Sequence, residues 1–241
     1  MFVVGFVLVA LGAVAAFYFY LARDLPDVRA LKRMDGITGF LWNSLGEKDS
    51  LARRNFRPVS FNELPPHVID AFTAAWDREF FSAAGRESYR EAGGGVRQCL
   101  VRRLLCDGPE AAQSRLHKHI LSLQIDLRLS REEEFTAWLN SLYFGNHAYG
   151  IEAAGRIYFG RSVSELSLAE AAMLAALPFA PATYNPAVNP ESVRNRRKWV
   201  LLSMRDHGFI SPEECLFASL MPVVPPIPPA RIAPAPLLSH Y

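Results

Sequence analysis

The sequence predicts a mostly α-helical globular domain that follows one N-terminal membrane-spanning helix. Two observations support this fold class: an uncharged apolar run near the N-terminus, and helix start signals that recur along the second half of the chain. Runs with clean apolar–polar alternation are too short for a sheet core. The chain has 241 residues and half of them are apolar, which is enough for one domain of ordinary size plus an anchor.

The apolar run from Phe2 to Leu21 is about the length that crosses the hydrocarbon core of a bilayer. It ends in an aromatic cluster at residues 17–20, and aromatic side chains favour the membrane interface. A cleaved signal peptide is the alternative, because small residues such as Ala13 and Ala15 could precede a cleavage site. The length of the run and the lack of a basic residue before it favour an uncleaved anchor over residues 1–22.

Helix signals define a domain that we expect at residues 56–221, after a juxtamembrane connector at residues 23–55. Capping boxes, in which a glutamate follows a serine by three residues, begin at Ser130, Ser167 and Ser211. Asn189-Pro190 fits an N-cap followed by proline at the first helical position. Apolar residues recur at helical spacing at Leu116, Ile120, Leu123 and Leu127. The proline-rich stretch at residues 222–241 is expected to be an extended tail, docked on the domain or loose in solvent.

The three cysteines, Cys99, Cys106 and Cys215, cannot all pair with one another. Cys99 and Cys106 lie two turns apart on an expected helix, about 10 Å by helical rise, which is too far for a disulfide. Their spacing does not match a metal site, so neither a metal nor a cofactor is expected. The net charge of +2 argues neither for nor against an anionic partner, and no nucleic-acid partner is expected.

The most specific pattern lies between Leu139 and Pro186, where YFG, GIEAA, a second YFG, LSLAEAA and APATYNP follow one another. This order resembles the peptidoglycan polymerases of glycosyltransferase family 51. The stretch RRKWVLLSM at residues 196–204 is similar to the RRxxVLxxM helix of that family. The resemblance covers roughly residues 56–220 and implies a lysozyme-like, mostly α glycosyltransferase domain.

The resemblance also implies a chemistry, in which a glutamate general base takes the proton of an acceptor sugar hydroxyl that attacks a lipid-linked donor. The family's first motif, E-D-x-x-F-x-x-H-x-G, aligns with the stretch WDREFFSAAG. Asp77, Phe80 and Gly85 match, but Trp76 stands at the general base and Ala83 at the histidine. Tryptophan has no group that accepts a proton.

The other two motifs of the family are also altered. The motif GGSTITQQ aligns with AGGGVRQC, in which Gln98 matches and glycines replace the two hydroxyl residues. The motif R-K-x-x-E aligns with SRLHK, in which Arg115 keeps a positive charge and Lys118 replaces the second glutamate. We expect Glu79 to be the best substitute acid, because it would lie one helical turn from Trp76 on nearly the same face.

Basic residues gather within and between the second and third motifs, at Arg97, Arg102, Arg103, Arg115, His117, Lys118 and His119. Arginine and lysine recognise phosphate, so we expect the cleft to hold a pyrophosphate or an anionic lipid headgroup. The alternative is that several of these charges face solvent on helix surfaces. The expected substrate contacts are Asp77, Phe80, Gly85, Gln98, Arg97, Arg115, Lys118 and Asn140.

The altered motifs predict a pseudoenzyme that binds lipid II, peptidoglycan glycan or a cell-wall synthase partner and does not polymerise. The alternatives are an active polymerase with relocated acids and a structural subunit of an envelope machine. The resemblance implies a domain on the periplasmic side of the bacterial inner membrane. The positive-inside rule favours the opposite orientation, because four basic residues follow the apolar run at Arg23, Arg29, Lys32 and Arg33.

Overall fold

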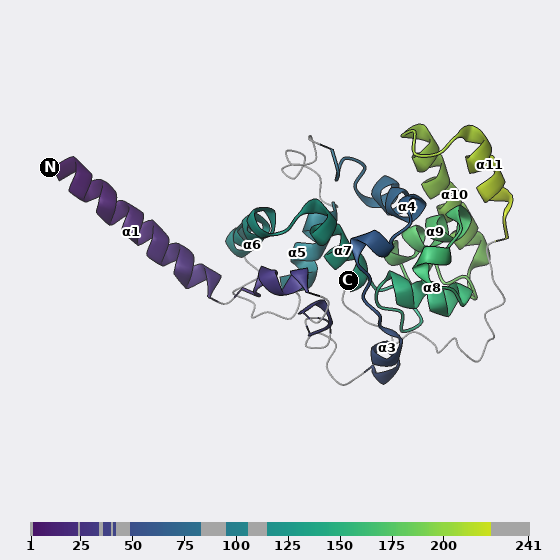
Figure 1. Ribbon diagram of the computed structural model, residues 1–241, viewed down its shortest axis with the longest axis horizontal. Helices are drawn as coiled ribbons and strands as arrows, with labels where there is room; N and C mark the ends of the chain where they lie inside the picture. Colours follow the sequence, from purple (N-terminus) through teal and green to yellow (C-terminus); the bar gives the residue numbers. More distant parts are fainter. Residues whose placement is uncertain are drawn as a thin grey trace.

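The structure is a computed structural model that describes residues 2–23, 25–33, 36–39, 41, 49–82, 95–105 and 115–222. Within these ranges the regular structure is helical, apart from an isolated antiparallel bridge between Tyr143 and Tyr149 (Figure 1). The expected mostly α fold is therefore confirmed. The proline-rich tail beyond Pro222 lies outside the described residues.

Helix α1 (Phe2–Ala22) projects away from the domain and exposes its apolar side chains (Figure 1). It is long and apolar enough to cross a membrane. Its C-terminal end is tied to the domain, because Gln124 Nε2 donates a hydrogen bond of 3.2 Å to the hydroxyl of Tyr18.

The expected connector packs into the domain through η1 (Val28–Lys32) and α3 (Ser50–Asn55). It contributes to the same hydrophobic core as the rest of the domain with five buried residues: Val28, Leu31, Ile37, Leu41 and Ala52. Lys32 pairs with Glu133 at 3.2 Å, and Asp27 lies 3.7 Å from Arg128. The core is therefore continuous across the expected boundary at residue 56.

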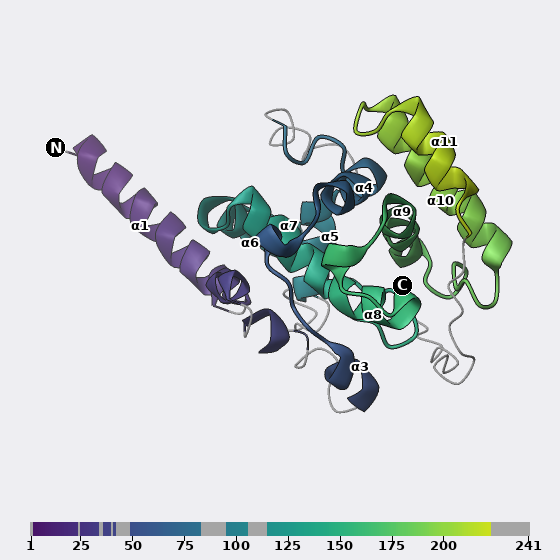
Figure 2. The ribbon, with the colours of Figure 1, turned by 45° about the vertical axis from the view of Figure 1, so that its right-hand side comes forward.

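The remaining helices form two groups (Figures 1 and 2). The group nearer α1 contains α5 (Val96–Leu105), α6 (Arg115–Arg128) and α7 (Arg131–Ser141). The other contains α4 (Pro66–Trp76), α8 (Ile151–Phe159), α9 (Leu168–Ala176), α10 (Pro190–Asp206) and α11 (Pro212–Leu220). Helix α9 is alanine-rich and almost entirely buried, and its small side chains let α4 and α10 pack closely against it.

The three serine capping boxes are confirmed at the starts of α7, α9 and α11. In each box the serine hydroxyl accepts a bond from the glutamate amide, and the glutamate carboxylate accepts one from the serine amide. Pro190 begins α10 as expected. Asn189 holds the N-cap position without a capping bond from its side chain, which instead donates to the carbonyl of Thr183.

The expected apolar stripe of α6 is helical, but only Ile120 is buried. The buried face of the helix instead includes His117, Leu121 and Ile125. The periodicity therefore identified a helix correctly and did not identify which of its faces enters the core.

Two cysteines, Cys99 and Cys215, lie among the described residues. Cys215 is buried and Cys99 is half-buried, and burial raises the pKa of the Cys99 thiol. Cys106 lies outside the described ranges.

Candidate functional site

Trp76 stands where the resemblance places the general base, and it packs into an aromatic cluster at the end of α4. Its indole Nε1 donates a hydrogen bond of 3.0 Å to the carbonyl of Ala175. Its ring stacks on Phe179 with centroids 3.9 Å apart, and it meets Trp138 edge-on at 5.5 Å. The one polar group of Trp76 is already paired, and it is a donor only. Position 76 therefore supplies packing and no base.

The stack continues onto α10 through a cation. The guanidinium of Arg196 lies 4.1 Å from the Phe179 ring and 4.2 Å from the Trp199 ring. We call Trp76, Phe179, Arg196 and Trp199 the aromatic stack. Contacts of this kind contribute about 0.5–2 kcal/mol each. The aromatic stack thus joins α4, the η7 turn (Leu177–Phe179) and α10 at the position of the expected base.

Asp77 is the matching acid of the first motif, and it organises the start of α5. Its Oδ2 accepts a hydrogen bond of 3.3 Å from the amide of Val96, the first residue of that helix. A Cβ added to Gly95 would lie 2.6 Å from the same oxygen, so a side chain there would displace the Asp77 carboxylate. Burial raises the pKa of Asp77, and the hydrogen bond from Val96 opposes that rise. Asp77 thus has a structural partner inside the domain.

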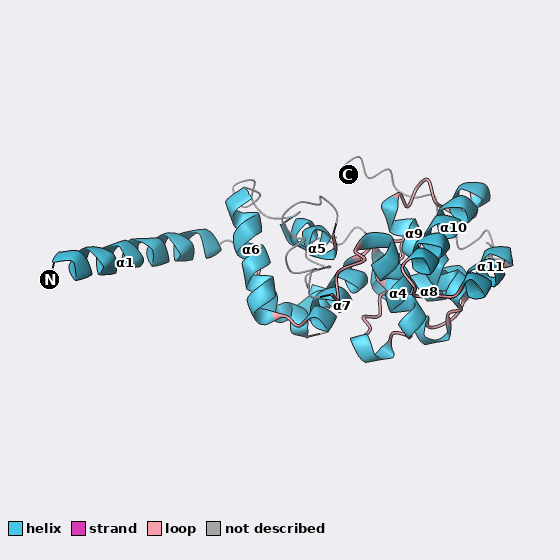
Figure 3. Cartoon of the chain, turned by 90° about the horizontal axis from the view of Figure 1, so that it is seen from above, coloured by secondary structure: helices cyan, strands magenta, loops and turns pink. Residues whose placement is uncertain are grey.

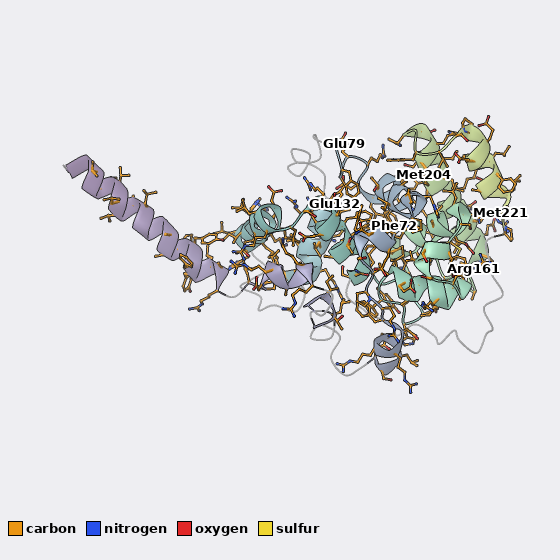
Figure 4. The ribbon with its side chains drawn as sticks, in the orientation of Figure 1. Phe72, Glu79, Glu132, Arg161, Met204 and Met221 are labelled. Atoms are coloured by element: carbon orange, nitrogen blue, oxygen red, sulfur yellow. The ribbon has the colours of Figure 1, made fainter. Side chains whose placement is uncertain are left out.

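The expectation that Glu79 shares a helix face with Trp76 is wrong, because α4 ends at Trp76. The chain leaves helical conformation at Asp77 and turns, which puts Glu79 on the surface. Figure 4 shows Glu79 at the periphery, apart from Phe72 in the interior. The turn is held to the end of α10, where Arg78 Nη1 donates to Nε2 of His207 at 3.0 Å. This geometry does not support Glu79 as a substitute base.

Phe80 is a core residue, although it was expected to contact substrate. It is buried against Phe81 and Phe135, and the guanidinium of Arg131 lies 5.1 Å from its ring. Gly85, another expected contact, lies outside the described residues, as do the glycines at 93 and 94. The glycine-rich second motif is therefore described only from Gly95 onward.

Arg97 is committed to carboxylates within the protein. It donates to both oxygens of Glu134, at 2.8 and 2.7 Å, and to Oδ1 of Asp126 at 2.9 Å. Glu134 is 1% exposed and also accepts a bond from Arg131. Burial alone would lower the pKa of Arg97, but the two carboxylates outweigh it and raise that pKa. Arg97 therefore stabilises the α5–α7 contact and is not an unpaired cation for a phosphate.

Asn140 also has intramolecular partners, at both the nitrogen and the oxygen of its side-chain amide. It is fully buried, its Nδ2 donates to the carbonyl of Val59 at 2.8 Å, and its Oδ1 accepts from the Val59 amide at 3.1 Å. This pair joins α7 to the strand-like segment before α4. We assign Asn140 a structural role in place of the expected substrate contact.

The remaining expected contacts lie on α5 and α6. Arg115 and Lys118 are exposed on α6, and Gln98 is half-buried on α5. Helix α6 packs mainly against α5, η1 and α1, whereas Trp76 lies in the group formed by α4, α9 and α10 (Figure 1). Two of the basic residues have other surroundings, because His117 is buried and Arg103 lies over the ring of Tyr149. The alternative that some of these charges face solvent is therefore correct for Arg115 and Lys118.

The segment that carried the resemblance is held by internal hydrogen bonds. Glu152 is buried and accepts bonds from Arg156 Nε at 2.7 Å, the Val163 amide at 2.8 Å and the Ser162 hydroxyl at 3.0 Å. Gly150 has φ 79°, and a Cβ there would approach the carbonyl of Asn140 to 3.1 Å. The polar residues and glycines of this segment therefore maintain the fold.

Sequence reasoning missed Phe179 and Glu134 and gave no part to Trp199. Phe179 directly precedes the APATYNP stretch, and Trp199 occupies an unspecified position of the RRxxVLxxM pattern, so neither is marked by the resemblance. Glu134 follows the capping-box residue Glu133, and in the sequence it is indistinguishable from the other acids in the first turn of α7. The partners of Glu134 and Phe179 on α5 and α4 lie about forty or more residues away in the chain. Hydrogen bonds and ring contacts join them in the structure, and no sequence signal indicates this pairing.

Comparison with known proteins gives consistent matches. The Transglycosylase family profile matches residues 84–205. Penicillin-binding protein 1A of Aquifex aeolicus (strain VF5) is 32% identical over 235 residues, which cover 88% of this chain and 32% of the relative. Penicillin-binding protein 1F of Bacillus subtilis (strain 168) is 34% identical over 187 residues, 71% of this chain and 26% of the relative. The crystal structure of penicillin-binding protein 1A from Haemophilus influenzae is similar at 30% identity and a TM-score of 0.43, over 70% of this chain and 18% of that one. The chain thus spans about a third of the length of these curated relatives, or less.

Proposed function

We propose that this chain, which belongs to the transglycosylase family of peptidoglycan glycosyltransferases (glycosyltransferase family 51), binds lipid II, glycan or a synthase partner in cell-wall assembly without polymerising lipid II. The observation that carries the proposal is the packing of Trp76. A general base must reach the proton that it removes, and it is typically worth about 10²–10⁴ in rate. Trp76 offers a single donor that is bonded to Ala175, between the rings of Trp138 and Phe179.

The second glutamate position supports the same proposal. Lys118 places an exposed cation there, and Arg115 adds another three residues earlier on α6. Two cations favour an anionic group such as a pyrophosphate, which arginine and lysine bind by charge and hydrogen bonds. Lys118 supplies no carboxylate at the position of the family glutamate, and its charge favours a binding role for this half of the site.

The proposal includes a location. Helix α1 anchors the chain in the bacterial inner membrane as a single span, with the domain in the periplasm. The length and apolar surface of α1 support the anchor, and its aromatic end carries Arg23 over the ring of Tyr20 at 4.8 Å. The periplasmic side follows from the substrate class of the family.

The test is an assay of the full chain with lipid II, in which saturable binding and glycan polymer are measured side by side. We expect saturable binding, no polymer, and weaker binding by Lys118→Gln. The double variant Trp76→Glu/Lys118→Glu restores both family acids. Trp199→Glu is a control for its Trp76→Glu half, because it adds the same single negative charge at the exposed end of the aromatic stack. Polymer from the unaltered chain would favour an active polymerase and overturn the proposal, whereas an absence of saturable binding would exclude lipid II as the ligand.

A further inference from the structure

The geometry points to the groove between α9 and α11 as the docking site for this chain's own proline-rich segment, residues 223–236. The groove has a volume of about 580 Å³ and lies beside α11, at the end of the domain farthest from α1 (Figure 3). We call it the α9–α11 groove. The inference is independent of the proposed function, because no residue of the aromatic stack lines this groove.

The α9–α11 groove is apolar and open. One wall is formed by residues 167–169 at the start of α9, and the other by α11, including Phe217 and Met221. Phe217 is 66% exposed and Met221 is 38% exposed. Leu220, which neighbours Phe217 on the helix surface, is 75% exposed. Exposed apolar side chains that gather around a groove are typical of an interaction surface.

The chain itself leaves α11 at this groove. Met221 is a lining residue, and it is followed by Pro222, the last residue that the structure describes. The buried guanidinium of Arg197 donates to the carbonyl of Met221 at 2.7 Å and to that of Pro222 at 3.2 Å. Figure 4 shows Met221 at the edge of the domain. The segment that follows is therefore tethered beside the groove, where a short tether gives an effective concentration on the order of millimolar.

The composition of residues 223–236 suits this groove. The stretch reads VVPPIPPARIAPAP, which is apolar apart from Arg231. Proline favours the extended polyproline II conformation, and segments of this kind dock in grooves with an aromatic wall at a low cost in entropy. Phe217 supplies the aromatic ring, and the flexible side chain of Met221 adapts to the shape of its partner. The groove and the segment therefore match in chemistry, and they belong to one chain.

Charge complementarity gives the direction in which the segment lies. Glu213 and Glu214 line the groove in the first turn of α11, and neither forms an ion pair within the described ranges. Glu213 lies about 12 Å from Met221 by helical rise. The six residues that end at Arg231 span about 19 Å in the polyproline II conformation. The segment is therefore long enough to turn back along α11 and bring Arg231 to the two carboxylates.

The test is photo-crosslinking of the full chain in detergent, with a benzophenone side chain in place of Phe217 or, in a separate variant, of Leu216. The two positions are adjacent in the chain and are 66% and 63% exposed, but only Phe217 lines the groove. Mass spectrometry maps the crosslinked peptides. From position 217 we expect crosslinks to residues 223–236 of the same chain at a yield at least about tenfold above that from position 216, because docking adds to a local concentration that the tether makes equal.

Three outcomes would overturn the inference. Similar yields from positions 216 and 217 would mean that the segment is loose beside α11. Crosslinked dimers from position 217, with a yield that rises with protein concentration, would mean that a second copy occupies the groove. Products with detergent alone from position 217 would mean that no polypeptide occupies it. None of these outcomes affects the proposed function, which is measured with lipid II.

The charge pair has its own variants. Glu213→Lys and Arg231→Glu are each expected to lower the crosslink yield from position 217 by up to about fivefold, which is the effect of one exposed ion pair. The double variant Glu213→Lys/Arg231→Glu restores the pairing and is expected to restore the yield. Glu132→Lys is the matched control, because it makes the same charge change at an exposed position of α7. No loss in either single variant, or an equal loss in the control, would contradict the proposed direction of the segment.

Discussion

The α8–α9 segment and the end of α4 both contain polar residues that match the family and are bonded inside the domain. The two regions differ in whether the neighbouring family residues are kept. In the first region, Glu152 accepts three hydrogen bonds and keeps the pattern of the family. At the end of α4, Asp77 binds the start of α5, but tryptophan occupies the position of the first family glutamate, and on α6 lysine occupies the position of the second. The matching residues Glu152 and Asp77 both have hydrogen-bond partners inside the domain. The residues that differ are those to which the resemblance assigns chemistry alone.

The largest expected effect tests whether Arg97 belongs to the scaffold. Glu134→Gln removes the buried charge that pairs with Arg97, and we expect a loss of about 3–5 kcal/mol in unfolding free energy, as for other broken buried ion pairs. Urea unfolding of the full chain in detergent measures this loss. Glu132→Gln is the control, since Glu132 is an exposed neighbour on α7 (Figure 4). A loss of unfolding free energy below about 1 kcal/mol would contradict the structural role of Arg97 and favour the expected substrate contact.

The second effect concerns the aromatic stack. Trp76→Ala removes a half-buried ring and its bond to Ala175, and we expect a loss of about 3 kcal/mol, at the low end for tryptophan because the ring is not fully buried. Trp199→Ala removes the exposed end of the same stack and is expected to cost about 1 kcal/mol. Thermal unfolding of both variants gives the comparison. Equal losses of stability in the two variants would contradict the assignment of Trp76 as a packing residue.

The smallest effect concerns Asp77. Asp77→Ala leaves the Val96 amide without its acceptor, and we expect a loss of about 1 kcal/mol, whereas Asp77→Asn keeps an acceptor and costs less. Burial raises the pKa of Asp77, so the folded state holds its proton more tightly than the unfolded state. This group therefore makes stability fall as pH rises from the usual carboxyl pKa through the raised one. The free energy of unfolding, measured across mildly acidic pH, should lose this pH dependence in Asp77→Asn. An unchanged pH dependence would mean that another group causes it.

Local signals predicted much of the fold and little of the candidate site. The capping boxes at Ser130, Ser167 and Ser211 were predictable, because both partners lie within four residues. The end of α4 was not, because the Asp77–Val96 bond spans 19 residues. The partner of Trp76 lies 99 residues away, so the sequence could show the lost base but not the stack that fills its place.

The limit of local sequence signals also explains why the buried face of α6 was predicted wrongly. Helical periodicity predicts that apolar residues share a face of the helix. It does not predict what covers that face. Leu123 and Leu127 satisfy the pattern and remain exposed, because the neighbours of α6 lie on its other side. A sequence pattern of this kind predicts the helix and leaves its surroundings to the tertiary structure.

The packing of Trp76 has an optical consequence. Three of the four tryptophans, Trp76, Trp138 and Trp199, lie along one run of rings that includes Phe179 and Arg196. Indole emission responds to a nearby cation and to the polarity around the ring, so these tryptophans report on the position that the resemblance assigns to the general base. A ligand that enters beside Arg196 would change that emission without any label, which makes the chain its own indicator of occupancy.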